Sequence, residues 1–355
     1  MLLHEHLENG ADKNPNFPFS EFEGNSLSYQ EANLLSNQLA NKLVSEGLEV
    51  GDRFAFLAKN CTEMAIMYYA ASKVGAVPVP LNYRLADQEW AYIINDSEAK
   101  LIIVKGNEYS DRINQISSEL KNVKKYISIS LDNSIEKFQD FYDWLSDSSN
   151  EKPTLKIHEN DDVYQMYTSG TTGHPKGAVL LQRNVAANIR QYLNSLTLPM
   201  PSRTLLVAPM YHAAAMINMC GCIAIGGTIV IQEDFIPQDV VDCLANEKIT
   251  HTVLVPAMIQ ACLVSVPNVA NNEYKDLDQI HYGASPIAPE TLKKAMDVFK
   301  CKFGQGFGMT ETVAVICLMT PEEHIRALNE KPELLKSCGR PAIDTQVEIR
   351  DENDN

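Results

Sequence analysis

Hydrophobic and polar positions follow two periods along this chain, one typical of amphipathic helices and one of short buried strands. The segment Ser28–Glu31 has the pattern of a capping box, and apolar residues at helical spacing follow it, which predicts a helix ending near 42–45. Helical spacing also predicts helices at Thr62–Val74, Asn184–Ser195, Gln238–Asn246 and Pro289–Phe299. Short apolar runs predict strands at Arg53–Ala58, Ala76–Pro80, Leu101–Val104, Val163–Tyr167, Thr204–Ala208, Thr228–Ile231, Thr252–Val255 and Gln279–Tyr282.

This alternation of strand and helix predicts an α/β protein with two doubly wound, mainly parallel sheets and flanking helices. The prolines of Ala76–Pro80 favour a strand at the edge of its sheet. A chain of 355 residues exceeds a typical single domain. The polar stretch Asn150–Glu159 marks the predicted boundary between a first α/β subdomain, residues 1–155, and a second one, residues 156–336.

The composition of the chain indicates which kinds of partner and which cellular compartment to expect. Thirty basic and forty-six acidic residues give a net charge of −16, which argues against nucleic-acid or anionic-membrane binding. The eight cysteines include no Cys-x-x-Cys pair, and Cys220 and Cys222 lie in an apolar run, as expected for small packed residues in a reducing cytoplasm. The first residues lack the basic start of a signal peptide, and Ala213–Ile225 is too short to span a membrane. A homodimer is left open.

The segment Thr168–Gly177 has the composition of a phosphate-binding loop. Small hydroxyl and glycine residues offer donors without steric bulk, and Lys176 adds a positive charge. The spacing is not that of Walker A, because Pro175 occupies the place of the second glycine. A Rossmann fingerprint beginning at Gly304 also fails, because Met309 stands at its last position. An ordinary Ser/Gly-rich surface loop is the alternative.

Three motifs together resemble those of the adenylate-forming enzymes, which include acyl-CoA synthetases, firefly luciferases and peptide-synthetase adenylation domains. They are the loop Tyr167–Gly177, the segment Tyr282-Gly-Ala-Ser-Pro286, and Gly306-Phe-Gly-Met-Thr-Glu311. The resemblance implies that a carboxylic acid attacks the α-phosphate of ATP, with Mg²⁺ present, and that the acyl group then passes to coenzyme A. The carboxylate is itself the nucleophile, so the protein supplies positioning and charge stabilisation.

The resemblance also implies a role for individual residues. Glu311 would bind Mg²⁺ with Thr168 near the metal, and Thr310 would donate its hydroxyl to the α-phosphate. Phe307 would stack on adenine, with Gly283 and Ala284 on the other side of the base. The full set implied for nucleotide binding is Thr168, Ser169, Gly170, Thr171, Thr172, Gly173, Lys176, Gly283, Ala284, Ser285, Gly306, Phe307, Gly308, Met309 and Thr310.

The class of acid that we expect as substrate is inferred from His212. By resemblance it would orient the carboxylate or polarise the α-phosphate, whereas a lone histidine would more often be structural. Amino-acid-loading relatives carry an aspartate at this position, because a buried ammonium group needs a partner. The segment after His212 is apolar, so an uncharged fatty or aryl acid is expected. Candidates for the acyl pocket are Met216, Met258, Gly306 and Val313.

The resemblance ends before the family pattern is complete. Residues 337–355 resemble the opening strand of a third, barrel-like subdomain, and the mobile C-terminal domain of the family has no counterpart before Asn355. We therefore expect an N-terminal part that is weak or inactive alone, with the acid and the acceptor thiol undetermined. A non-catalytic nucleotide or acyl-adenylate binding module is the main alternative. An unrelated NTP hydrolase would instead hydrolyse ATP without any acid.

Overall fold

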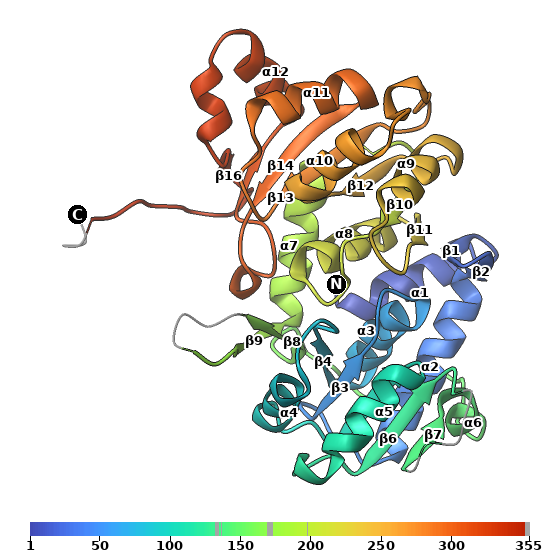
Figure 1. Cartoon of the computed structure of the whole chain (residues 1–355). Helices are drawn as coiled ribbons and strands as arrows, with labels where there is room; N and C mark the ends of the chain where they lie inside the picture. The colour runs from blue at the N-terminus through green and yellow to red at the C-terminus, as the bar shows by residue number, and fades with distance from the viewer. Residues whose placement is uncertain (132–134, 136, 169–172, 197, 352–355) are drawn as a thin grey trace.

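Two β-sheets organise the chain, and Figure 1 shows them in two lobes with helices packed on their faces. The computed structural model describes all residues except 132–134, 136, 169–172, 197 and 352–355. The smaller sheet is parallel throughout, in the order β4 (Val77–Leu81), β3 (Arg53–Leu57), β5 (Leu101–Lys105), β6 (Lys125–Ile129) and β7 (Phe138–Asp140). The proline-containing strand β4 lies at its edge, as predicted.

The larger sheet has nine strands and is parallel across its centre. Its order is β16 (Arg340–Pro341), β15 (Cys317–Met319), β14 (Lys302–Phe307), β13 (Gln279–Gly283), β12 (His251–Val253), β10 (Arg203–Leu206), β11 (Thr228–Ile231), β1 (Pro18–Phe22) and β2 (Asn25–Ser28). The strands from β14 to β1 are parallel, whereas β2, β15 and β16 pair antiparallel. The predicted α/β class with mainly parallel sheets is therefore confirmed.

The predicted division near residue 155 stays a prediction, but strand pairing crosses it. Strand β1 lies early in the chain and pairs with β11, so the first residues complete the larger sheet. One buried core joins the two lobes, since it includes Phe54 of β3 and Ile229 of β11. A second core fills the space between strands β12–β14 and the helices beside them.

The helices begin and end close to the predicted positions. Ser28 accepts a hydrogen bond from the Glu31 amide at the start of α2, and the Glu31 carboxylate accepts from the Ser28 amide, so the capping box is confirmed. The α-helices are α1 (Leu3–Lys13), α2 (Tyr29–Ser45), α3 (Thr62–Val74), α4 (Asp87–Asp96), α5 (Asn107–Ile116), α6 (Phe141–Leu145), α7 (Gln182–Asn194), α8 (Ala213–Ala224), α9 (Pro237–Asn246), α10 (Pro256–Ser265), α11 (Pro289–Phe299) and α12 (Pro321–Asn329). Short 3₁₀ turns are η1 (Ser117–Glu119), η2 (Val269–Asn271), η3 (Thr310–Thr312) and η4 (Pro332–Lys336).

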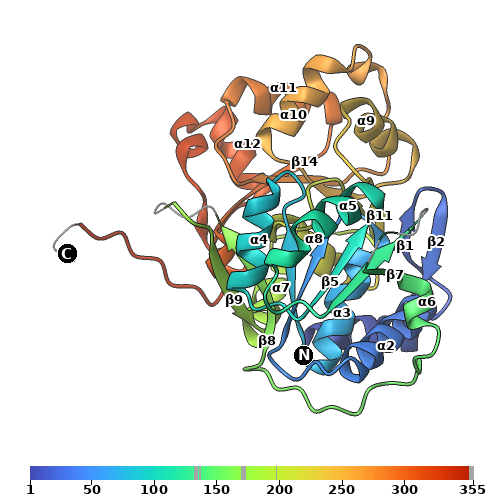
Figure 2. The same ribbon diagram turned by 60° about the horizontal axis from the view of Figure 1, so that its bottom comes forward.

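A separate hairpin carries the predicted phosphate loop. Strands β8 (Asp162–Thr168) and β9 (Lys176–Leu181) pair antiparallel, with Thr168 opposite Lys176. Figure 1 shows strands β8 and β9 at the junction of the two lobes, and Figure 2 shows the same two strands side by side from below. The loop thus joins two strands, whereas nucleotide-binding loops of open α/β sheets usually join a strand to a helix.

The C-terminal segment differs from the barrel strand that the sequence suggested. Strand β16 is short and pairs with β15 at the edge of the larger sheet. Residues 345–351 have no regular secondary structure and extend away from the body of the protein in both views. Among the described residues no strand pairs with this segment, so no hydrogen-bonded ladder holds it as a strand.

The cysteines and the apolar helices agree with what the sequence predicts for them. All eight cysteines are free, and Cys220 and Cys222 are buried in α8, as predicted for small apolar residues. Burial raises the pKa of the Cys222 thiol to about 12, so the thiol stays protonated. Within the part of the chain that the structure describes, no helix has the length and apolar character needed to cross a membrane.

Candidate functional site

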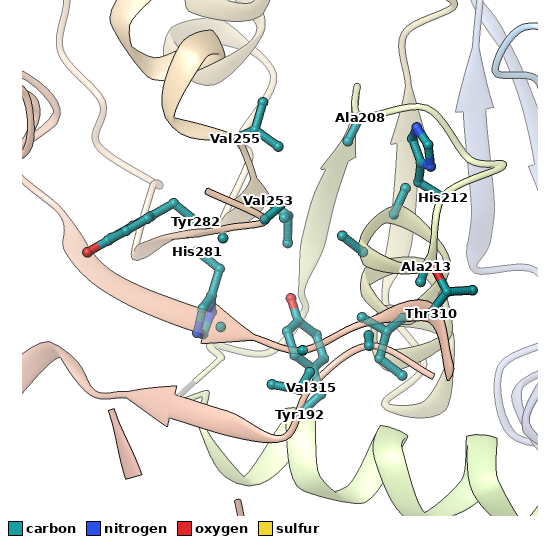
Figure 3. Close-up of a pocket in the computed structure, with 18 of the residues that line it drawn as sticks. Tyr192, Ala208, His212, Ala213, Val253, Val255, His281, Tyr282, Thr310 and Val315 are labelled. Carbon is teal, nitrogen blue, oxygen red and sulfur yellow. The ribbon is translucent and has the colours of Figure 1, made fainter. Parts of the chain in front are cut away.

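A pocket of about 440 Å³ lies beside the carboxyl ends of strands β12, β13 and β14, where helix α8 begins. Ligands of α/β proteins usually bind at this edge of a parallel sheet. Seven of the residues predicted for catalysis or nucleotide binding line it together: His212, Gly283, Ala284, Gly306, Gly308, Met309 and Thr310. Most of the other lining side chains are apolar, and they come from α8, α10 and the strands (Figure 3).

The glycines of β13 and β14 give the pocket a wall of bare backbone. Gly283 pairs with Gly306, and a Cβ on Gly283 would collide with the carbonyl oxygen of Gly306. A Cβ on Gly308 would likewise overlap the carbonyl group of Ala314. Ala284 follows with a φ of 65°, a left-handed conformation that turns the chain sharply. A Cβ on Gly306 would instead face Val315 and Leu318 of the pocket lining, so its absence lets a planar group approach the wall closely at this point.

The amino end of helix α8 faces the pocket. His212 is its N-cap residue, and Ala213, Ala214 and Ala215 of the first turn line the pocket. The amide groups of a first helical turn have no partner within the helix, and the helix dipole places partial positive charge there. Because the side chains of this first turn are alanines, this end leaves room for an anionic group such as a carboxylate or phosphate.

His212 lies at the same end of the pocket, where its ring is 4.3 Å from the ring of Tyr211. Its side chain is open to the pocket, but dehydration by the surrounding protein lowers the pKa of the imidazole, and the guanidinium of Arg84 lowers it further. The neutral form is thus favoured. A neutral imidazole has one N–H donor and one acceptor, so it can donate a hydrogen bond to an oxygen of the bound acid.

The phosphate-loop hairpin is anchored beside 3₁₀ turn η3, which carries Thr310 and Glu311 and is contacted by strand β9. The phenol of Tyr167 donates to Asp96 of α4 at 2.6 Å. The ring of His174 stacks on Tyr92 of α4, with centroids 4.9 Å apart. Lys176 is exposed at the start of β9, so its ammonium group is accessible to a ligand.

The remaining predicted residues lie around the pocket rather than in its wall. Phe307 ends strand β14 with 45% of its surface exposed, which leaves an aromatic face available for stacking. Ser285 follows Ala284, and Thr168 and Gly173 belong to the phosphate-loop hairpin and its loop. The predicted ligands Ser169, Gly170, Thr171 and Thr172 lie outside the described residues.

A metal site built from protein ligands alone is absent from the described part of the chain, where no three His, Cys, Asp or Glu side chains converge. Mg²⁺ usually binds one or two carboxylates and completes its shell with substrate phosphates and water. Glu311 is an exposed carboxylate on η3, next to Thr310, and this donor set fits such an ion. The assignment of the metal to Glu311 and Thr168 stays a prediction.

Sequence reasoning missed three polar residues of the pocket: Arg84, Tyr192 and His281. Arg84 follows strand β4, forms an ion pair with Asp234 at 3.3 Å and lies over the ring of Tyr83. Arg84 and Tyr192 lie in no recognised motif, and only the fold brings them to the pocket, whereas His281 directly precedes the motif that begins at Tyr282. Two of the proposed acyl-pocket residues, Met258 and Gly306, line the pocket.

The other two acyl-pocket candidates, Met216 and Val313, do not line the pocket, so the prediction for these two residues is corrected. Both side chains belong to the buried core that joins the lobes, with 1% and 3% of their surface exposed. Met216 lies one helical turn into α8, and its sulfur is 3.0 Å from the sulfur of Cys220 within the core. Spacing from a motif identified the correct helix but could not determine which of its faces is turned to the pocket.

Comparison with known proteins agrees with this geometry. A sequence profile described as AMP-binding enzyme matches residues 7–355. A long-chain-fatty-acid–CoA ligase from Mycobacterium tuberculosis is 29% identical over 91% of this chain and 61% of the relative. A feruloyl-CoA synthase from Amycolatopsis is 28% identical over 92% of this chain and 61% of the relative. The chain thus spans about three fifths of the length of these curated relatives.

A solved structure shows the same fold. The inhibitor-bound N-terminal domain of FACL13 from Mycobacterium tuberculosis superposes with a TM-score of 0.89 and 26% identity, covering 100% of this chain and 85% of that one. The match extends over both sheets, so the arrangement of the two lobes is also that of this domain.

Proposed function

Because the chain belongs to the AMP-binding enzyme family, we propose that it binds ATP and a carboxylic acid at this pocket and forms an acyl-adenylate there. The observation that carries the proposal is the convergence of the bare wall of β13 and β14, the amino end of α8 and turn η3 on one pocket. The first offers a surface for adenine, the second a site for an anion, and the third a hydroxyl and a carboxylate.

In the proposed reaction, an oxygen of the substrate carboxylate attacks the α-phosphorus of ATP. A new P–O bond forms, the bond between the α-phosphorus and the bridging oxygen breaks, and pyrophosphate leaves with the electron pair. The amino end of α8, the His212 imidazole and the Thr310 hydroxyl would stabilise charge on the carboxylate and the α-phosphate. Lys176 would hold the β- and γ-phosphates.

Mg²⁺ would be held by Glu311, with Thr168 nearby, and would neutralise charge on the phosphates. The sulfur of coenzyme A would then attack the carbonyl carbon of the acyl-adenylate, forming a thioester as the bond from that carbon to the phosphate oxygen breaks, AMP leaves with the electron pair, and the thiol proton passes to solvent. These assignments rest on the family relationship and the placement of the residues. The eight free cysteines support a reducing, cytoplasmic location as part of the same proposal.

The proposed acid carries no ammonium group. The pocket is lined by apolar side chains such as Val253, Val255 and Met258, and no Asp or Glu lines it within the described part of the chain. A buried ammonium without a carboxylate partner would be strongly disfavoured. Fatty and aryl acids both fit this lining, and the two relatives above are named for one substrate of each kind.

The test is calorimetric binding of ATP and of a stable acyl-adenylate mimic to this chain and to Lys176→Met. Because the mimic lacks the β- and γ-phosphates, the substitution should weaken ATP binding by about tenfold or more and leave mimic binding unchanged. Lys121→Met, at an exposed position in the other lobe, is the matched control. Failure of the unaltered chain to bind either ligand would overturn the proposal. Binding of both without pyrophosphate release on adding acid would favour a non-catalytic binding module.

A further inference from the structure

One wall of the pocket is formed by a short connecting segment, residues 207–212, which leads from strand β10 to helix α8. Ala208, Pro209 and His212 of this segment line the pocket, and Figure 3 shows Ala208 and His212 on the same side of it. Most of the segment is buried, and a turn hydrogen bond joins the His212 amide to the Pro209 carbonyl at 3.0 Å. Buried backbone groups need partners, so the groups that bond to this segment determine where His212 lies.

The side chain of Asn60 supplies such partners from the lobe of the smaller sheet. Asn60 lies between β3 and α3 and is only 2% exposed. Its Nδ2 donates to the carbonyl oxygens of Ala208 and Gln232, each at 3.1 Å, and lies 3.4 Å from that of Val207. Its Oδ1 accepts from the Met210 amide at 2.8 Å. Acceptors face the nitrogen and a donor faces the oxygen, so the surroundings determine the orientation of this amide.

Two tyrosines of the same lobe hold the segment closer to His212. The Tyr68 hydroxyl, from α3, donates to the Met210 carbonyl at 3.2 Å. The ring of Tyr83 packs edge-on against the ring of Tyr211, with centroids 5.6 Å apart. The Tyr211 ring in turn lies beside that of His212, at 4.3 Å between centroids. Both the amide and the carbonyl of Met210 are thus bonded to the lobe of the smaller sheet, and His212 follows two residues later.

We propose that Asn60 is a positioning residue for acyl-adenylate formation, because its hydrogen bonds fix the connecting segment and thereby the place of His212 and of the amino end of α8. This inference rests on the proposed function. Asn60 does not itself line the pocket, so it acts through the segment. Displacing a positioned group by about 1 Å can slow a reaction by about 100-fold, even when the altered residue is remote from the chemistry.

An isosteric substitution at Asn60 would break these bonds without leaving a cavity. Aspartate has nearly the same shape, but in place of the donor nitrogen it turns a second oxygen toward the carbonyl oxygens of Ala208 and Gln232. These buried carbonyl groups would lose their partner, and an ionised carboxylate would repel them. We expect the segment to relieve this contact by moving away from position 60, and His212 moves with it.

The experiment measures by calorimetry how 5′-O-(N-octanoylsulfamoyl)adenosine, a stable acyl-adenylate mimic, binds to the unaltered chain, to Asn60→Asp, to His212→Ala and to the double variant. Asn60→Asp should weaken binding about tenfold or more, because His212 no longer meets the acyl oxygen. In the His212→Ala background the same substitution should weaken binding about twofold or less, since the group that Asn60 positions is gone. Leu39→Ala, which opens a cavity beneath α2, lowers stability alone and should keep the affinity of the unaltered chain.

The outcomes separate this inference from the proposed function. If the unaltered chain does not bind the mimic, the adenylate site itself is wrong and the inference falls with it. If Asn60→Asp leaves the affinity unchanged, or lowers it equally with and without His212, the adenylate site stands and the positioning role is overturned. Should Asn60→Asp fail to fold, Tyr68→Phe removes one hydroxyl from the same segment and should weaken binding about two- to tenfold, only when His212 is present. No loss, or an equal loss in both backgrounds, overturns the inference there too.

Discussion

The glycines of the pocket wall serve different physical purposes. A Cβ on Gly306 would meet only Val315 Cγ1 at 3.6 Å and Leu318 Cδ2 at 4.0 Å, which are ordinary contacts. The absence of a side chain at Gly306 therefore keeps the pocket wide rather than making the strand possible. At Gly283 the added atom would overlap the Gly306 carbonyl, so the close pairing of β13 with β14 itself requires glycine.

We predict opposite phenotypes for substitutions at these two positions. Gly306→Leu fills the pocket, so it should weaken binding of a long-alkyl adenylate mimic about tenfold or more, affect an acetyl mimic less, and leave thermal stability nearly unchanged. Gly283→Ala forces the strands apart and should lower the free energy of unfolding by about 1–3 kcal/mol. Calorimetry and urea unfolding measure the two effects. Wild-type affinity of Gly306→Leu for the long mimic would show that the acyl chain lies elsewhere.

At the scale of elements, the phosphate-loop hairpin gains its position from contacts with α4. The stack of His174 on Tyr92 and the hydrogen bond from Tyr92 to the Pro175 carbonyl, at 3.4 Å, hold the carboxyl end of the loop. A Cβ on Gly177 would meet the Gln165 amide and the Tyr167 ring, so glycine there lets Tyr167 lie across the hairpin toward Asp96. The loop is thus held at both of its ends.

Tyr92→Leu should therefore weaken ATP binding by about two- to tenfold, because the loop loses its aromatic support and must be ordered when the phosphates bind. The acyl-adenylate mimic, which lacks the β- and γ-phosphates, should bind as before. Isothermal titration of both ligands tests this, with far-UV circular dichroism to confirm the fold. Equal loss for both ligands would mean that the substitution damages the pocket rather than the loop.

Local signals in the sequence predicted most elements, because their causes are local. The Ser28–Glu31 capping box starts α2, and the prolines of β4 keep it at a sheet edge. The pairing of β1 with β11 was not predictable in this way, since nothing near either strand specifies a distant partner. Arg84 was missed for the same reason, whereas His281 directly precedes the motif that begins at Tyr282 and could have been considered from its position. The fold brings Lys176, Thr310 and Glu311 near the pocket, and the roles assigned to them stay predictions.

At the scale of the whole molecule, buried histidines couple stability to pH. Burial lowers the pKa of His251 to about 4, and it also lowers the pKa of His281 and His324. In the unfolded chain the pKa of these imidazoles is about 6.5. Below that pH these imidazoles bind protons in the unfolded state but stay neutral in the folded state. The free energy of unfolding therefore falls as pH decreases from about 6.5 toward about 4.

We predict that the free energy of unfolding in urea falls between pH 7 and pH 5, with His251 alone contributing about 2 kcal/mol of the loss. The net charge of −16 shrinks in the same range and acts in the opposite direction, but salt screens that surface repulsion more than it screens buried groups. The titration is therefore made at about 0.15 M salt. His251→Gln should flatten the pH dependence and exposed His158→Gln should not. A stability that stays constant or rises on acidification would mean that these imidazoles are protonated inside the folded protein.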